Sequence, residues 1–244
     1  MDKNDRLTGD LETLYTTINL EGMEAIRSGQ EKIDPHLNNL GQDKRLGLTL
    51  LITIKGEITQ GFQFLTEEIQ KIESEQYFYP ETDLHITILD LISATESFEK
   101  NDAMIRESIK VVQNAMKGLS PFDVQFNGII ASNAAILVKG YDDGGLQKLR
   151  RRTRKTASEY GIILKERYQS ISAHSTIVRF KKALKNREQL SAVLQQYHDF
   201  DMGVMKVNEL ELVVHDWYNR KKDSVRKLLW LNLAASAGIC GEKN

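Results

Sequence analysis

The sequence predicts a fold of mixed strands and helices built from two copies of one strand-helix-strand-helix-strand unit. The pattern His-x-Thr-apolar occurs twice, at His85 and at His174, 89 positions apart. Both halves of the chain show the same expected order of elements. In each half the first strand begins about 39 residues before the histidine, at Leu46 and at Ala135. A fixed offset combined with a matching element order indicates an internal duplication.

In the first half, residues 46–54 are apolar and rich in β-branched side chains, which predicts a buried strand. A helix over 59–72 follows, capped by Thr59 and carrying its apolar residues on one stripe. A second apolar stripe predicts the next helix, which Gly118 ends. The remaining elements expected in this half are the histidine strand 84–92, that helix at 101–117 and a strand at 121–130.

The second half repeats this order, with a helix that ends at Gly161. Its expected elements are a strand at 134–140, a helix at 144–160, the histidine strand 171–180, a helix at 186–197 and a strand at 204–214. A last strand at 228–233 is expected to join one of the sheets.

Residues 1–40 fall outside the duplicated pattern. Their apolar residues recur at helical spacing, namely Leu7, Leu11, Leu14, Tyr15 and Ile18. We interpret this segment as a helical extension packed over the main body, in preference to a dimerisation arm or a substrate lid. The expected organisation is therefore an extension at 1–40 and a main domain at 46–233, with one lobe at 46–130 and the other at 134–233.

Composition bounds the class of protein. With 244 residues and 41% hydrophobic content the chain can fill one large core or two packed lobes. A net charge of -1 excludes a generally basic protein that coats nucleic acid. The single cysteine, Cys240, cannot form an internal disulfide, and no apolar run approaches the roughly 20 residues of a membrane helix. We expect a soluble cytoplasmic protein without membrane contact, most simply a monomer.

The two motifs bring together side chains suited to acid-base chemistry. In a strand, side chains two positions apart point to the same face, so each histidine stands beside its threonine. Imidazole titrates near neutrality, and hydroxyl groups can donate hydrogen bonds to phosphate oxygens. The alternative is that each histidine is a hydrogen-bonded core residue and each threonine an ordinary strand former. Two copies at equivalent places of a duplicated unit favour the functional interpretation.

The motifs His85-Ile86-Thr87-Ile88 and His174-Ser175-Thr176-Ile177 resemble those of the two-histidine phosphoesterase superfamily. This superfamily includes LigT-type RNA 2',5'-ligase-like proteins and 2',3'-cyclic-nucleotide phosphodiesterases. The resemblance spans about residues 46–233. It implies a bilobal α+β fold with pseudo-twofold symmetry, in which two antiparallel sheets flank a central cleft.

The resemblance also implies a site and an activity. His85 and His174 are expected to act as general acid and base, and Thr87 and Thr176 to hold the phosphate. Such a site needs no metal and no cofactor. Arg179, five positions after His174, is similar to a basic residue that often follows the second motif, whereas the first copy has Asp90 at that place.

Three other features bear on the expected site. Tyr168 can stack on a base at the cleft mouth or pack in the core. The basic run Lys148–Lys155 is interpreted as a solvated helix face, with a phosphate-binding edge for RNA as the alternative. His215 is the only rival histidine, and we assign it no catalytic role.

The sequence therefore predicts a metal-independent hydrolase, a phosphodiesterase acting on a nucleotide or RNA-derived substrate. The bond cleaved is a cyclic phosphate, such as that of a 2',3'-cyclic nucleotide, or a 2'-5' phosphodiester. The expected site comprises the catalytic residues His85, Thr87, His174 and Thr176 and the substrate-binding residues Tyr168 and Arg179. Two alternatives remain open: a non-catalytic nucleotide- or RNA-binding module, and an RNA-processing or ligating enzyme that acts on longer RNA.

Overall fold

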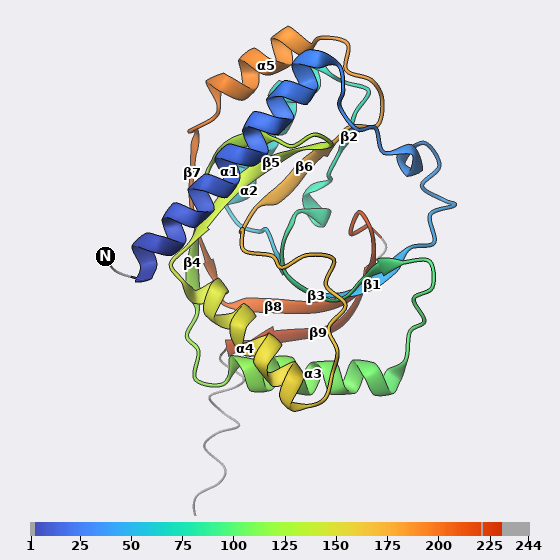
Figure 1. Cartoon of the computed structure of the whole chain (residues 1–244), viewed down its shortest axis with the longest axis vertical. Helices are drawn as coiled ribbons and strands as arrows, with labels where there is room; N and C mark the ends of the chain where they lie inside the picture. The colour runs from blue at the N-terminus through green and yellow to red at the C-terminus, as the bar shows by residue number, and fades with distance from the viewer. Residues whose placement is uncertain (1–2, 221, 231–244) are drawn as a thin grey trace, which may run out of the picture.

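Two antiparallel β-sheets form the body of the protein (Figure 1). The computed structural model describes residues 3–220 and 222–230. The first sheet has the strand order β3-β1-β8-β9, with bounds His85–Thr95, Leu46–Thr53, Glu209–Asp216 and Asp223–Leu229. The second sheet has the order β2-β6-β5-β4-β7, with bounds Tyr77–Phe78, Ser175–Arg179, Ala135–Asp142, Phe122–Ala131 and Asp201–Val207.

The two halves of the chain exchange their third strands. Strand β4 belongs to the first half but pairs with β5 in the second sheet, and β8 belongs to the second half but pairs with β1 in the first sheet. The first sheet thus contains β3 and β1 of the first half beside β8 of the second half. The second sheet contains β6 and β5 of the second half beside β4 of the first half. The predicted α+β fold with two antiparallel sheets is confirmed, and each sheet draws on both halves of the chain.

Three strand predictions need correction. The strand expected at 204–214 is two strands, β7 and β8, which Asn208 separates as the chain passes from the second sheet to the first. The second histidine strand begins at Ser175, not at 171, because the carbonyl of Ser172 accepts a hydrogen bond from the Arg150 side chain. The last strand, β9, begins earlier than expected, and positions 231–233 of the prediction lie outside the described residues.

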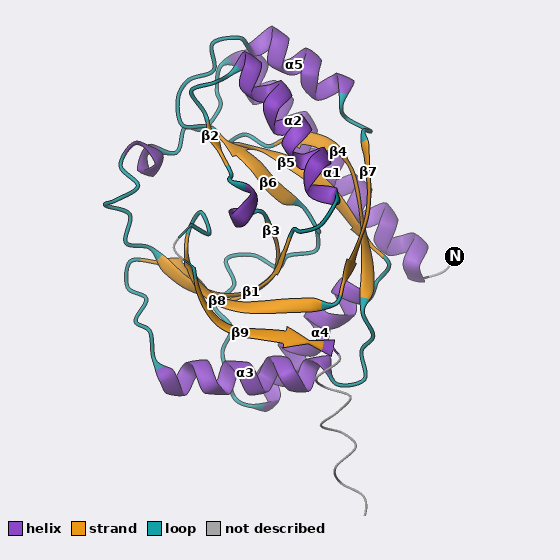
Figure 2. Ribbon diagram, turned by 180° about the vertical axis from the view of Figure 1, so that it is seen from behind, coloured by secondary structure: helices purple, strands orange, loops and turns teal. Residues whose placement is uncertain are grey.

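Five α-helices and two short 3-10 helices complete the described chain. Helices α1, α2 and α5 contact strands of the second sheet, whereas α3 and α4 lie together beside the first (Figure 2). Helix α3 begins where expected, because the Asn101 side chain accepts hydrogen bonds from the backbone amides of Ala103 and Met104. The bounds are α1 Lys3–Ser28, η1 Pro35–Asn38, α2 Ile58–Ile72, η2 Glu81–Asp83, α3 Asp102–Met116, α4 Gly145–Glu159 and α5 Arg187–Gln196.

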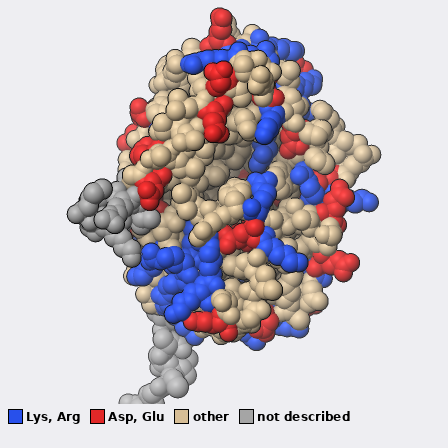
Figure 3. All heavy atoms as spheres, in the orientation of Figure 1, with Lys and Arg blue, Asp and Glu red and all other residues tan. Residues whose placement is uncertain are grey.

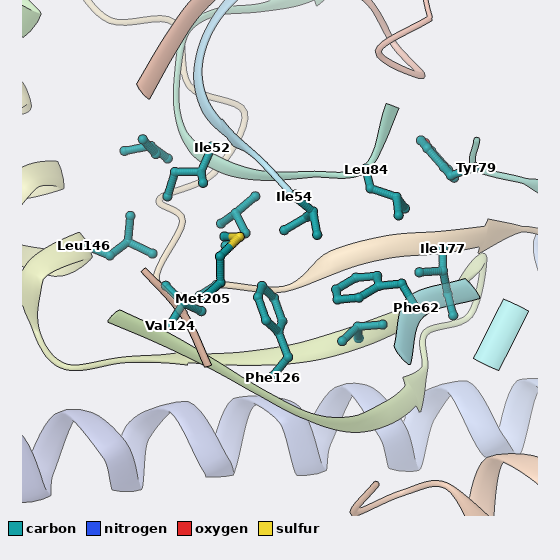
Figure 4. Close-up of a cluster of buried hydrophobic side chains, with 14 of the residues drawn as sticks. Ile52, Ile54, Phe62, Tyr79, Leu84, Val124, Phe126, Leu146, Ile177 and Met205 are labelled. Carbon is teal, nitrogen blue, oxygen red and sulfur yellow. The ribbon is translucent and has the colours of Figure 1, made fainter. Parts of the chain in front are cut away.

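One hydrophobic core joins the sheets and their helices (Figure 4). Phe62 of α2 and Phe126 of β4 meet edge to face, with ring centroids 5.1 Å apart, and both are fully buried. Burying one such side chain stabilises the fold by about 1.5–3 kcal/mol. The core therefore fixes the strands on which both motifs stand.

Helix α1 is held against the second sheet by its own contacts. Leu11 and Tyr15 pack on residues of β4 and β5 in a separate small cluster. The Tyr15 hydroxyl donates to the carbonyl of Gly140 at 2.8 Å and accepts from the Gly140 amide at 3.2 Å. Within the described residues, no helix is both long and apolar enough to cross a membrane.

Candidate active site

Both His-x-Thr motifs line one cavity of about 100 Å³ between the two sheets. His85 and Thr87 reach it from β3, and His174 and Thr176 reach it from the start of β6. The two residues predicted to bind substrate, Tyr168 and Arg179, also line this cavity. The structure thus brings together all six residues that the sequence singled out.

The two motif strands share one pattern of burial. His85 and Thr87 are partly accessible while Ile86 is buried, and the same alternation holds for the second motif. Directly after each His-x-Thr, one residue is extra relative to the neighbouring strand, Ile88 opposite β1 and Ile177 opposite β5, and β3 has two further register shifts beyond Asp90. An extra residue of this kind is a β-bulge, and it shifts the side chains beyond it to the other face. The β-bulge is therefore duplicated together with the regular part of each motif strand.

The bulges explain why Asp90 and Arg179 reach the cavity. Both lie five positions after a histidine, and in a regular strand they would point away from it. The extra residue returns both to the cavity side, where they line its wall. The Asp90 carboxylate accepts hydrogen bonds from the hydroxyls of Thr49 and Ser93, at 2.9 and 3.3 Å, and burial raises its pKa.

Arg179 is oriented by a tyrosine. Its Nε donates to the Tyr79 hydroxyl at 2.9 Å. Among the described residues this is the only hydrogen bond of its side chain, so the terminal nitrogens can donate to an anion in the cavity.

A backbone carbonyl fixes the tautomer of His85. Its Nδ1 lies 2.8 Å from the carbonyl oxygen of Asp83 and 3.2 Å from the amide nitrogen of Asn219; the shorter contact is to an atom that only accepts, which places the proton on Nδ1. Nε2 is then left to exchange a proton with a ligand. The buried Asn219 donates to the same carbonyl at 3.0 Å from a left-handed backbone conformation, with φ of 61°. Asn219 thereby holds the acceptor that orients His85.

His174 has a partner of a different kind. Its Nδ1 lies 2.7 Å from the Ser172 hydroxyl, which can donate or accept, so both tautomers of His174 are compatible with this contact. The pKa of both His85 and His174 is lowered to about 4, mainly by burial, and the Arg150 cation contributes to the lowering at His174. Both imidazoles are therefore neutral near pH 7 while the cavity holds no anion.

Arg150 links the two motif strands. Its side chain is fully buried and donates to the carbonyls of Thr87 and Ile88, at 2.8 and 2.7 Å, and to that of Ser172 at 2.8 Å. The first two carbonyls belong to the first motif strand, and the third lies two positions before His174. The interpretation of the basic run as a solvated face is thus wrong at this position, since helix α4 turns Arg150 toward the interior.

Several cavity residues were missed from the sequence. His215 of β8 lines the cavity with its ring centroid 6.1 Å from that of His85, and burial lowers its pKa to about 3. Trp217 lies between two cations, with the guanidinium carbons of Arg45 and Arg167 at 4.7 and 4.6 Å from its ring centroid. His215 was named from the sequence but given no catalytic role, and the expected strand ended at 214, one position short of it.

Tyr168 is 55% exposed and lines the mouth of the cavity, so it does not pack in the core.

Searched over the described chain, no group of three or more His, Cys, Asp or Glu side chains is arranged to hold a metal ion.

A family model described as "AKAP7 2'5' RNA ligase-like domain" matches residues 48–224, well over half of the chain and inclusive of both motifs. The chain belongs to this family. The AKAP7 2'5' RNA ligase-like family is part of the two-histidine phosphoesterase superfamily, as the motifs predicted. Membership supports a phosphodiesterase-type or RNA-ligase-like role. Helix α1 and Arg45 precede the matched segment of this family.

Solved structures show the same fold at low sequence identity. A protein of Thermus thermophilus is similar with a TM-score of 0.54 and 14% identity, over 75% of this chain and 97% of that one. Escherichia coli LigT complexed with 3'-AMP gives 0.51 and 14%, over 76% and 98%. A conserved Agrobacterium tumefaciens protein of unknown function gives 0.55 and 10%, over 85% and 97%. The comparison with curated proteins found no significant match.

Proposed function

We propose that the protein is a metal-independent phosphodiesterase that cleaves a cyclic phosphate or a 2'-5' phosphodiester of a nucleotide or RNA end. The observation that carries this proposal is the pair of His-x-Thr motifs on two sides of one cavity. A β-bulge follows His-x-Thr in both strands. Two proton-transfer groups and two hydroxyls facing one small space suit a phosphate that exchanges one oxygen substituent for another. A site that only bound nucleotides would have no use for both imidazoles.

In hydrolysis, one imidazole takes a proton from water as the water oxygen attacks phosphorus. The other imidazole gives a proton to the departing ribose oxygen as the phosphorus–oxygen bond breaks. The Thr87 and Thr176 hydroxyls and the Arg179 guanidinium donate hydrogen bonds to the non-bridging oxygens, where negative charge builds up. After the reaction the base carries a proton and the acid has lost one. Transfer of one proton from the first to the second through solvent restores the starting protonation states.

The lowered pKa values bear on how the acid is formed. Near neutrality both imidazoles are neutral in the free protein, so one must gain a proton as the substrate binds. The phosphate anion supplies the reason, because a negative charge within about 4–6 Å favours the protonated imidazole. Substrate binding and protonation are then coupled.

The test is turnover of a substrate panel by the wild-type chain and by His85→Ala and His174→Ala. The panel contains 2',3'-cyclic mononucleotides, RNA ending in a cyclic phosphate, 2'-5' oligoadenylates and ADP-ribose cyclic phosphate. Each substitution should lower kcat by about 10²- to 10⁴-fold, and the double variant should be little worse than either single one. His36→Ala, which changes an exposed histidine outside the cavity, is the matched control and should turn over normally.

Added EDTA should leave the rate unchanged. A rate that collapses in EDTA and returns with added metal would contradict the proposal, as would near-normal turnover by His85→Ala. Nucleotide binding without turnover of any panel member would instead identify a binding module.

A further inference from the structure

A second and larger cavity opens from the phosphate cavity. Its volume is about 660 Å³, and six residues line both spaces: Arg167, Tyr168, His174, Thr176, Arg179 and Trp217. Figure 3 shows a hollow on this face of the molecule, bordered along one side by Lys and Arg side chains. A molecule whose phosphate lies between the two histidines therefore has room for a large substituent on the His174 side. Binding pockets for small molecules commonly measure about 300–1,000 Å³.

Much of this cavity is built by residues that precede the family-matched segment 48–224. Leu14 and Ile18 of α1 form one wall, and the chain between α1 and β1 forms a second. The contributors before residue 48 are Leu14, Ile18, Lys32, Ile33, Asp34, Pro35 and Arg45. These residues complete a cavity whose remaining lining lies within the matched segment, so its shape depends on the place of α1 over the second sheet.

One part of the cavity wall is apolar. Leu14, Ile18 and Ile33 stand on the N-terminal side, and Ala135 and Leu137 of β5 stand beside them. Such a surface suits the face of a planar, weakly polar ring. Tyr168, at the junction of the two cavities, offers an aromatic face for the same kind of group.

The charged lining is mainly cationic, with Lys32, Arg45, Arg167 and Arg179 against the single carboxylate of Asp34. Asp43 already neutralises Arg45, whose Nη2 and Nε bind that carboxylate at 2.6 and 2.9 Å. Arg167 differs, because its guanidinium stacks between the rings of Trp217 and Tyr168 and forms no ion pair with any described residue. A stacked guanidinium keeps its in-plane N–H groups available to an anion.

We propose that this cavity is a subsite for a nucleoside that carries a second phosphate, with the base against the apolar wall and the second phosphate at Arg167. The preferred substrate is then a nucleotide with at least two phosphate groups, such as an oligonucleotide end, in place of a cyclic mononucleotide. The proposal rests on the proposed function for the position of the scissile phosphate. It assigns α1 the role of a specificity wall.

The test is a ladder of three ligands measured by titration calorimetry on the full-length chain at one fixed salt concentration. Inorganic phosphate reaches only the histidine cavity, adenosine 3'-monophosphate adds the nucleoside, and adenosine 3',5'-bisphosphate adds the second phosphate. Each step should tighten binding by about tenfold or more.

Two variants with matched controls separate the two parts of the subsite. Ile18→Trp fills the apolar wall and should weaken both nucleotides about tenfold without changing the affinity for inorganic phosphate. The control Leu20→Trp places the same bulk on the same helix at a side chain that is 66% exposed and outside the cavity, and it should change nothing. Arg167→Gln should abolish the advantage of the bisphosphate over the monophosphate, whereas Arg151→Gln removes one charge from an exposed site elsewhere and should preserve it.

Equal affinities for the three ligands, or equal effects of Ile18→Trp and Leu20→Trp, would overturn this inference even if the protein hydrolyses cyclic mononucleotides. A different result is that the affinity rises at each step and loses those gains in Ile18→Trp and Arg167→Gln, while the protein cleaves no phosphodiester. That result would support the subsite and overturn the proposed function. Circular dichroism of each variant checks that α1 and the sheets remain folded.

Discussion

At the scale of single residues, the two motif histidines are neutral because they are withdrawn from water. Burial lowers the pKa of each to about 4, from an ordinary value of 6.5. An imidazole with a depressed pKa gains a proton readily only when a negative charge arrives beside it. Anion binding should therefore take up a proton.

This coupling gives a prediction that uses sulfate, whose charge is constant over the pH range in question. Sulfate should bind more tightly as pH falls from 7 toward 5, by up to about tenfold per pH unit, because one proton enters with each anion. Titration calorimetry in buffers of different ionisation enthalpy measures both the affinity and the number of protons taken up. In the double variant His85→Ala/His174→Ala the dependence should flatten; a wild-type affinity that is constant over this range would contradict the coupling.

Tyr168 is expected to act on binding more than on chemistry. It is 55% exposed at the mouth of the cavity, where it can stack on a base in the bound substrate and in the transition state alike. Tyr168→Ala should thus raise KM by about five- to tenfold with little change in kcat. Steady-state kinetics on the substrate panel measure both constants. The matched control is Tyr160→Ala, a tyrosine of similar exposure outside the cavity; a loss of kcat alone in Tyr168→Ala would refute stacking.

The sequence identified the residues whose signal is local. His85 and Thr87 could be found because alternation along a strand needs no partner, and the same holds for His174 and Thr176. Asp90 and His215 could not be assigned to the cavity, since one depends on a bulge and the other on a strand supplied by the opposite half of the chain. The catalytic roles of the four motif residues stay predictions.

At the scale of elements, helix α4 connects the two motif strands through Arg150. A buried guanidinium that satisfies three carbonyls holds the strands at a fixed separation, and its loss would leave those acceptors without a partner. The cation also lowers the pKa of His174. Arg150 is thus a positioning residue, which touches neither of the two imidazoles through a hydrogen bond.

Arg150→Met should lower the free energy of unfolding by about 3 kcal/mol or more, because each stranded acceptor costs about 1–3 kcal/mol. It should also raise the pKa of His174, which NMR titration of the ring protons measures and which a purely structural role would not change. Arg151→Met, one position along on an exposed face, should stay within about 0.5 kcal/mol of the wild type. An unchanged titration of His174 in a folded Arg150→Met protein would exclude the electrostatic part of this role.

Element boundaries were predicted well at Asn101 and at the glycines that end helices, and poorly where the backbone changes partner. The predicted cap at Thr59 is wrong, because α2 begins at Ile58 and the Thr59 hydroxyl donates to the Gly56 carbonyl instead of accepting from a helix amide. Asn101 places the start of α3 correctly because the cap is local. The division of 204–214 at Asn208 escaped prediction because apolar residues recur on both sides of Asn208 and only the sheets decide where one strand ends. The start of β6 escaped for a similar reason, since the competing partner of Ser172 is a side chain 22 positions away.

At the scale of the whole molecule, the exchange of β4 and β8 makes each sheet a product of both halves. A fragment ending at 133 lacks β5 and β7, the two strands that pair with β4, and a fragment beginning at 134 lacks β1, the inner partner of β8. Each fragment would expose apolar strand faces that only the other covers.

We therefore expect fragments 1–133 and 134–244 to be unfolded separately and to form one folded complex when mixed or produced together. Circular dichroism and size-exclusion chromatography of each fragment and of the mixture test this. A fragment that unfolds cooperatively on its own would show that the halves are independent lobes.

The corner at Asn208 also limits how the site exchanges its ligands. One residue separates β7, in one sheet, from β8, which is hydrogen-bonded on both edges in the other. Because one residue joins the two sheets there, we expect the sheets to move little relative to each other. Entry and release are then left to the segments at the rim of the cavity, residues 32–45 and 161–174. We therefore expect the shape of the opening, and not a closing movement of one half upon the other, to discriminate among ligands.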